Sequence, residues 1–251
     1  MGTVVTSGPP AFAQVHHRSS TTSGHYRMPH ASHLARGPCK AGAECFIVRA
    51  DLREPGSVDA LLETVTWAEG QGRTVRGLVN CAAKLLSPSF AKTKPEDFDD
   101  YFAVNVKAPL FLAQALVPHM TGGGSIVNVS SASAHFSSPG DLVYAMSKAA
   151  LESLTANAAE AVAAEGVRIN HVIPGFTDNG HRAFNVPAAR DYMSSFSVLG
   201  GISQPEEVAA AVLFLLSEEA SRITGTGIDV SGGSTLGARG HRAGSISQFL
   251  Q

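Results

Sequence analysis

The sequence predicts a single α/β domain built around a doubly wound, mostly parallel β-sheet. From Glu44 onward, short apolar runs of the β type alternate with longer helical patterns, which is how consecutive βαβ units read in a sequence. Several of the short runs are apolar without alternation, as expected for strands that helices cover on both faces. With 251 residues, of which 44% are hydrophobic, the chain can bury one sizeable core.

Five strands and three helices can be placed from these patterns. The strands are expected at residues 45–50, 75–80, 125–130, 167–173 and 227–230. Thr93 and Ser203 each stand three residues before a glutamate, with a proline between, and this arrangement predicts two helix starts of the capping-box type. A stretch rich in Ala, Leu and Glu over residues 141–165 predicts a long helix that stops before Gly166.

Composition and charge exclude several function classes. The formal net charge is -2, and no long basic run is present, so neither nucleic acid nor a membrane surface is an expected partner. The three cysteines, Cys39, Cys45 and Cys81, have no metal or haem spacing, so no metal is expected. No apolar run reaches transmembrane length and the first residues do not resemble a signal peptide, so we expect a cytoplasmic protein that acts on a small molecule.

The strongest chemical signal is a tyrosine and a lysine four residues apart, Tyr144 and Lys148, within the long predicted helix. This spacing puts the phenol and the ammonium on one helix face. A phenol titrates near pH 10 when unperturbed, so a neighbouring cation is needed to stabilise its phenolate at neutral pH. Just upstream, an apolar strand ends in Ser130 and Ser131, at the sheet edge where α/β proteins bind ligands.

This order, a strand ending in Ser-Ser and then Tyr-x-x-x-Lys on a helix, resembles the short-chain dehydrogenase/reductase family. Ser131 lies thirteen residues before Tyr144, as the catalytic serine does in that family. Further matches follow in order: Asn80 to Ala83 resembles the family's Asn-Asn-Ala-Gly strand end, Asn105 its helix asparagine, and Pro174-Gly175 its Pro-Gly after a late strand. The resemblance covers residues 44–236 and is closest to the ketoacyl-reductase-like branch, which implies a Rossmann-like fold.

The resemblance implies a role for each matching residue. Ser131 would hydrogen-bond the substrate oxygen, Tyr144 would exchange the proton, and Lys148 would lower the tyrosine pKa and hold the ribose of NADP or NAD. Asn105 would hold a water that links Lys148 to solvent. The other implied cofactor contacts are Asp51 at the adenine, Thr177 or Asn179 at the nicotinamide carboxamide, and four residues of the matching motifs, Asn80, Ala82, Pro174 and Gly175.

The first 43 residues are atypical and hold a degenerate form of the family's cofactor loop. They contain no Asp or Glu, and the pattern Thr-Gly-x-x-x-Gly-x-Gly would fall on residues 6–13 with its glycines replaced by Ser7, Ala11 and Ala13. Two consecutive prolines also remove amide donors from that turn. These changes predict weak or absent dinucleotide binding.

A second alignment of the same segment resembles relatives that use an Arg and Ser pair for the 2′-phosphate of NADP. It places the second strand end at Val15 and His16 and the phosphate contact at Arg18. Three interpretations of residues 1–43 therefore stay open: a remodelled NADP site, a lost cofactor site, and a misassigned start of the chain.

The preferred function is NAD(P)-dependent reduction of a ketone or oxidation of a secondary alcohol. The alternatives are a cofactor-independent lyase, cyclase or dehalogenase on the same fold, and a non-catalytic binding protein. The partly aromatic segment 176–200 is expected to cover the substrate pocket, and residues 237–251 form a C-terminal tail. The resemblance also implies a homodimer or homotetramer.

Overall fold

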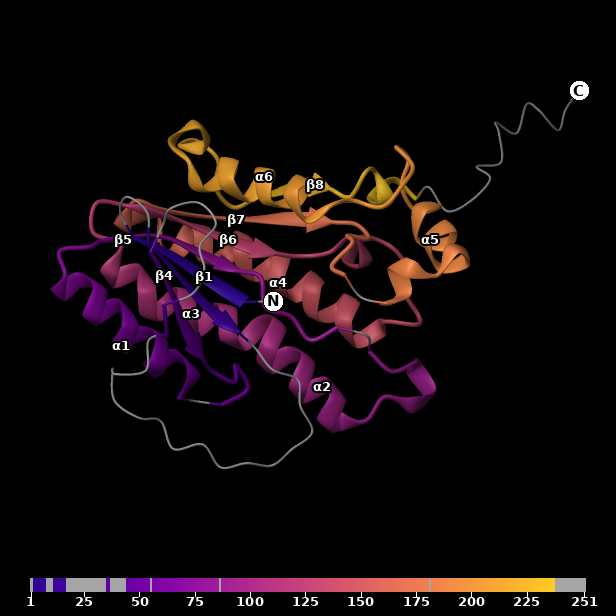
Figure 1. Ribbon diagram of the computed structural model, residues 1–251, viewed down its shortest axis with the longest axis horizontal. Helices are drawn as coiled ribbons and strands as arrows, with labels where there is room; N and C mark the ends of the chain where they lie inside the picture. The colour runs from indigo at the N-terminus through magenta and orange to yellow at the C-terminus, as the bar shows by residue number, and fades with distance from the viewer. Residues whose placement is uncertain are drawn as a thin grey trace, which may run out of the picture.

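A computed structural model of the protein describes residues 2–7, 11–16, 35–36, 44–54, 56–85, 87–180 and 182–237 (Figure 1). Its strands are β1 (Gly2–Ser7), β2 (Ala11–His16), β3 (Ala35–Arg36), β4 (Glu44–Arg49), β5 (Val75–Asn80), β6 (Gly124–Val129), β7 (Val167–Pro174) and β8 (Gly227–Val230). Its α-helices are α1 (Ser57–Gly70), α2 (Pro95–Phe102), α3 (Ala108–Leu116), α4 (Leu142–Ala161), α5 (Pro187–Ser194) and α6 (Pro205–Leu216). No helix among these residues is long and apolar enough to cross a membrane.

The described strands form one sheet in the order β3-β4-β2-β1-β5-β6-β7-β8. Strands β5, β6, β7 and β8 are parallel neighbours, and β2 is parallel to β4. Helices α1, α3 and α4 pack on one face and α6 on the other (Figure 1). The prediction of a doubly wound, mostly parallel α/β domain is confirmed, and the five predicted strands begin and end within one residue of the observed ones.

The first two strands differ from the expected arrangement, because β1 runs antiparallel to both of its neighbours. Its last residue, Ser7, pairs with Ala11 in β2 and with Val75 at the start of β5. The candidate glycine-type turn after β1 therefore leaves the sheet at the amino edge of β5, away from the carboxyl edge where Asn80 lies. Only three residues separate β1 from β2. A connection this short permits a hairpin and excludes the helical crossover that a parallel pair requires.

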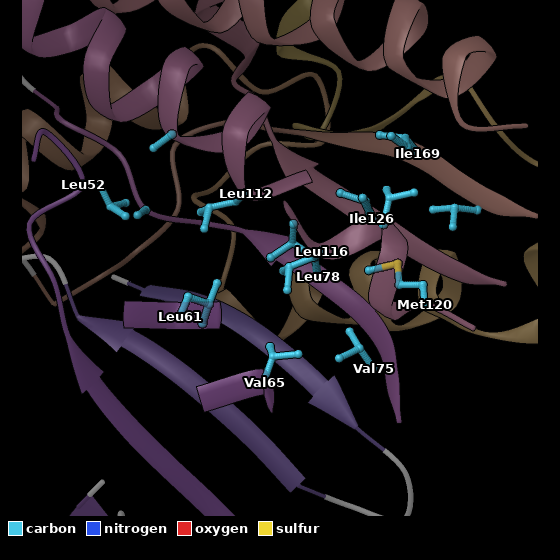
Figure 2. Packing of buried hydrophobic residues seen from close by; sticks show 14 of the residues in the cluster. Leu52, Leu61, Val65, Val75, Leu78, Leu112, Leu116, Met120, Ile126 and Ile169 are labelled. Carbon is cyan, nitrogen blue, oxygen red and sulfur yellow. The ribbon is translucent and has the colours of Figure 1, made fainter. Parts of the chain in front are cut away.

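The larger part of the hydrophobic core lies under α1 and α3, against β5, β6 and β7 (Figure 2). Burial of each large aliphatic side chain there contributes about 1.5 to 3 kcal/mol relative to an exposed position. The labelled members are Leu52, Leu61, Val65, Val75, Leu78, Leu112, Leu116, Met120, Ile126 and Ile169. A smaller cluster under α6 covers the opposite face of β6 and β7.

At two helix starts a carboxylate accepts a capping hydrogen bond as predicted, but the cap residue and the carboxylate each lie one residue later than predicted. The Lys94 amide donates to Asp97 Oδ2 at 3.0 Å at the start of α2, and the Gln204 amide donates to Glu207 Oε2 at 2.7 Å at the start of α6. The shift arises because the proline takes the first helical position in each case, so the residue directly before it becomes the cap.

Candidate active site

Helix α4 brings Tyr144 and Lys148 to the carboxyl edge of the sheet. The Lys148 side chain is buried, and its ammonium donates a hydrogen bond of 2.6 Å to the Val129 carbonyl oxygen at the end of β6. The same nitrogen lies 5.7 Å from the centroid of the Tyr144 ring. Burial lowers the pKa of Lys148 to about 8, because the charged form loses its hydration.

Ser131 follows β6 and caps the short 3₁₀ helix Ala132–His135. Its Oγ accepts hydrogen bonds from the Ser133 amide at 3.2 Å and from the Ser133 hydroxyl at 3.0 Å. Burial raises the pKa of Tyr144 to about 12, and a hydrogen bond from Ser131 acts in the opposite direction. The structure therefore brings Ser131, Tyr144 and Lys148 together, with the lysine beside the ring. A lowering of the tyrosine pKa by Lys148 stays a prediction.

Asn105 lies in a π-helical turn, Ala103–Lys107, between α2 and α3. Its amide nitrogen donates to the Lys84 carbonyl at 3.2 Å and to Ser147 Oγ at 2.9 Å, and its Oδ1 accepts from the Lys84 amide at 2.8 Å. Ser147 in turn donates to the Tyr144 carbonyl at 2.7 Å. Asn105 thus joins the loop after β5 to helix α4, whereas its role as a water holder beside Lys148 stays a prediction.

Four of the expected cofactor contacts lie at the ends of β5 and β7. Asn80 donates to Asn128 Oδ1 at 2.8 Å, while its own buried Oδ1 has no partner among the described residues. Ala82 is part of the core. Pro174 ends β7, and Gly175 leaves room for a tight contact, because a Cβ there would come within 2.8 Å of the Ser231 carbonyl oxygen.

The remaining expected cofactor contacts are less conclusive. Thr177 Oγ1 donates to the Gly175 carbonyl at 3.2 Å, so its hydroxyl is used within the loop. The Asp51 carboxylate accepts a hydrogen bond of 2.6 Å from the Arg53 guanidinium, which raises the pKa of Arg53. Arg18 lies outside the described residues.

The described residues fit the nicotinamide and ribose half of a dinucleotide. An ammonium carries three donors, and Lys148 donates one hydrogen bond within the described part of the chain, so further donors can meet ribose hydroxyls. The unpartnered Oδ1 of Asn80 offers a buried acceptor at the same edge. The far half of the dinucleotide would lie toward β2 and β4, where β2 ends at His16 beside Arg49 on the carboxyl edge.

Sequence reasoning missed the contacts of three residues beside this site, Glu152, His135 and Cys81. Glu152 lies one turn beyond Lys148 on α4 and accepts a hydrogen bond from Ser130, with its carboxylate also 3.0 Å from His135 Nε2. Cys81 is interpreted from the sequence only as a small substitute in the strand-end motif. Burial raises the pKa of its thiol and the charge of Lys148 lowers it, which places the thiol in the field of the active-site lysine.

An aromatic cluster stands over the ends of β6 and β7. Its centre is Phe196, whose ring centroid lies 5.6 Å from that of Phe136, 5.3 Å from that of Phe176 and 5.2 Å from that of Tyr192. Phe136 directly follows the 3₁₀ helix capped by Ser131, and the other three belong to the segment expected to cover the pocket. Phe136 was not predicted, because nothing in its local sequence indicates that it meets Phe196.

No cluster of three or more His, Cys, Asp or Glu side chains among the described residues could hold a metal ion. A family model described as enoyl-(acyl carrier protein) reductase matches residues 25–235.

Two curated relatives and one solved structure illustrate the similarity. The 3-oxoacyl-[acyl-carrier-protein] reductase of Thermotoga maritima is 38% identical over 161 residues, which cover 63% of this chain and 65% of the relative. The (3R)-3-hydroxyacyl-CoA dehydrogenase of Canis lupus familiaris is 33% identical, covering 74% of this chain and 72% of the relative. A crystal structure of the angucycline C-6 ketoreductase LanV with bound NADP has a TM-score of 0.74 at 39% identity, covering 78% of this chain and 77% of that one.

The family model covers most of the chain, and the solved ketoreductase structure superposes on 78% of it. The chain belongs to the short-chain dehydrogenase/reductase family and is an oxidoreductase of that type.

Proposed function

We propose that the chain reduces a ketone to a secondary alcohol with NADPH, using Ser131, Tyr144 and Lys148. The observation that carries the proposal is that the three side chains meet where the carboxyl end of β6 lies beside the first turns of α4. The structure of the similar ketoreductase LanV contains bound NADP, which supports NADP as the dinucleotide here. When bound, the reduced dinucleotide supplies the hydride.

Ser131 is oriented to donate a hydrogen bond to the substrate oxygen. In the free site the Ser131 hydroxyl hydrogen bonds to Tyr144, and a bound carbonyl oxygen would accept this hydrogen in place of the phenol. A donor fixed at the place where negative charge develops stabilises the transition state. Tyr144, in hydrogen-bond contact with Ser131, would then donate to the same oxygen.

Tyr144 is suited to give a proton rather than to take one. With a pKa raised to about 12 by burial, the phenol is protonated at neutral pH. A protonated phenol can neutralise the alkoxide that forms as a ketone is reduced, which favours the reducing direction. Lys148 would hold the ribose through the donors that Val129 leaves unused.

The aromatic cluster supports an apolar, ring-containing substrate. Three of its members come from the segment after β7 and one directly follows the 3₁₀ helix that Ser131 caps, so the cluster adjoins the segment that carries Ser131. Aromatic side chains bind flat apolar groups by stacking and edge-to-face contacts. A bicyclic aryl ketone should therefore have a higher kcat/KM than a short 3-oxoacyl thioester.

The proton-transfer role is tested with Tyr144→Phe. Loss of the phenolic proton should lower kcat by at least about a hundredfold, the usual contribution of a general acid. Reaction is followed by the absorbance of the reduced dinucleotide, and an unchanged NADPH dissociation constant controls for folding. Activity within a few-fold of the unmodified protein would show that Tyr144 has another role. Turnover without any dinucleotide would instead support cofactor-independent chemistry at the same residues.

Binding of the dinucleotide is tested at Arg18. In the second alignment Arg18 lies two residues beyond β2, whose last residue pairs with Arg49 at the carboxyl edge of the sheet. A lost charge-assisted hydrogen bond to the 2′-phosphate costs about 1.5 to 3 kcal/mol, so Arg18→Ala should weaken NADPH binding by roughly 10- to 100-fold. NADH lacks this phosphate and its dissociation constant should not change. Equal weakening of both dinucleotides would rule out this alignment. Because no glycine turn reaches this edge among the described residues, we propose that both dinucleotides bind weakly.

A homodimer or homotetramer is proposed on the family resemblance. Sedimentation velocity over a concentration series should show an oligomer, and a monomer at every concentration would contradict it.

A further inference from the structure

Glu152 is a largely buried carboxylate that the proposed reaction does not use. It lies four residues after Lys148 on α4, on the same helix face, and its side chain is 16% exposed. A carboxylate removed from water to this extent is stable only where hydrogen bonds or charges compensate for the lost hydration. Its partners therefore indicate what it does.

The carboxylate binds both ends of the segment that carries Ser131. Ser130 Oγ donates to Glu152 Oε1, and His135 Nε2 lies 3.0 Å from the same oxygen. Ser130 directly precedes Ser131, and His135 is the last residue of the 3₁₀ helix that Ser131 caps. One side chain on the catalytic helix thus fixes the residues on either side of the cap.

The same segment has few other anchors. The Ser130 amide donates to the Val172 carbonyl at 2.8 Å, which extends the β6–β7 ladder by one residue. Beyond that point the ladder ends, and the Ser133 and Ala134 amides donate only to Ser131, at Oγ and at the carbonyl oxygen. Ser131 itself is hydrogen-bonded to Tyr144, and Phe136 packs on Phe196, so Glu152 adds a polar anchor at each end of the 3₁₀ helix.

The second carboxylate oxygen faces a buried histidine. Glu152 Oε2 lies 3.8 Å from His171 Nε2 on β7. Gly227 on β8 leaves the space for this imidazole, because a Cβ at that position would come within 2.2 Å of Nε2. The two carboxylate oxygens of Glu152 thus have different neighbours, Oε1 the Ser130–His135 segment and Oε2 the imidazole of His171, which limits how far the side chain can turn.

We propose that Glu152 is a positioning residue that holds the Ser130–His135 segment against α4 and so fixes the Ser131 hydroxyl relative to Tyr144. The inference rests on the proposed role of Ser131 in the reaction. It explains why a carboxylate is retained one turn beyond the catalytic lysine, where it touches neither the tyrosine nor the substrate oxygen. Its charge also raises the pKa of Lys148, so the kinetics of the variants are compared at a pH low enough to keep Lys148 charged in every variant.

A double-mutant cycle with Ser131→Ala tests the inference. Glu152→Gln keeps the size of the side chain but removes the negative charge that strengthens the hydrogen bonds from Ser130 and His135. It should lower kcat by about tenfold. A displacement of a catalytic group by about 1 Å can cost roughly a hundredfold, so the expected loss lies within that range. Ser131→Ala should lower kcat by on the order of a hundredfold. If Glu152 acts through Ser131, the double variant should be no slower than Ser131→Ala alone. Losses that multiply would overturn the inference while the unmodified protein still reduces the ketone.

Hydrogen exchange gives a second test that needs no activity. In Glu152→Gln the Ser133 and Ala134 amides should exchange about tenfold faster, as expected when one hydrogen bond no longer opposes local opening. Amides of the β6–β7 ladder serve as the internal reference. Ser130→Ala, which removes the other partner of the same hydrogen bond, should act in the same direction, and Glu160→Gln, at an exposed position of α4, should change nothing. Unchanged exchange of both amides in Glu152→Gln and Ser130→Ala would overturn the inference even if the proposed reaction were wrong.

Discussion

Replacement of Lys148 by methionine should abolish turnover and, near pH 7, make the fold more stable. The lysine side chain is 2% exposed, and burial lowers its pKa from 10.5 to about 8. One pKa unit corresponds to about 1.4 kcal/mol, so burial of the charged form costs roughly 3 kcal/mol. Methionine has a similar length without the charge, and replacement of a buried charge by an apolar side chain often stabilises a protein by about 1 to 4 kcal/mol. Loss of the hydrogen bond to the Val129 carbonyl reduces the gain.

The pH dependence of this difference gives the sharper test. Between about pH 8 and 10.5 the lysine is neutral in the folded chain and charged in the unfolded chain, so unfolding takes up a proton. The free energy of unfolding of the unmodified protein should therefore rise with pH across this window, by about 3 kcal/mol relative to the methionine variant, and the difference should be constant below it. Urea unfolding at several pH values measures this.

A nearby thiol must be removed for the comparison to be clean. Cys81 and Lys148 perturb each other's pKa, so Cys81→Ala is introduced into both proteins. The raised pKa of Tyr144 is common to both and cancels in the difference. A difference in unfolding free energy that does not change from pH 8 to 10.5 would refute the argument that Lys148 is destabilised by burial.

Two further substitutions test the packing around the site. Asn105→Leu removes three hydrogen bonds that join the loop after β5 to α4, and it should lower the free energy of unfolding by about 2 to 3 kcal/mol, measured with urea, and lower kcat as well. Gly227→Ala should destabilise the fold by about 1 to 3 kcal/mol in the same assay, because its Cβ would fall within 2.2 Å of His171. His171→Ser in the same chain should restore most of that loss, and a persistent loss would mean that the imidazole is not the obstacle.

Most of the fold from β4 onward could be predicted because its signals are local. Each strand there is a short apolar run, and the order of strands and helices admits few topologies once parallel pairing is assumed. The N-terminal hairpin could not be predicted in this way. The sequence places a cofactor turn over residues 6–13, or a second strand end at Val15 and His16, and neither alignment predicts that residues 2–7 and 11–16 pair antiparallel across a three-residue connection.

The candidate site also has one part that the sequence predicts and one part that it does not. Tyr144 and Lys148 share a helix, and Ser131 follows a strand at the expected spacing, so sequence alone predicts that they can meet. The contacts of Glu152 depend on how the end of β6 packs against α4 and β7, which no spacing along the chain records. A partial signal was available, because Glu152 stands four residues after Lys148 and therefore on its helix face.

Helix α4 carries two buried charges with opposite effects on the active site. Lys148 is retained although its burial destabilises the fold, which is typical of a group kept for its chemistry rather than for stability. Glu152 partly compensates, since its charge raises the pKa of Lys148 while its hydrogen bonds hold Ser130. Removal of Glu152 should therefore affect the site twice, through the position of Ser131 and through a further fall in the pKa of Lys148. The cycle with Ser131→Ala isolates the first effect when it is run at a pH at which Lys148 is charged in every variant, and its repetition at higher pH reports the second.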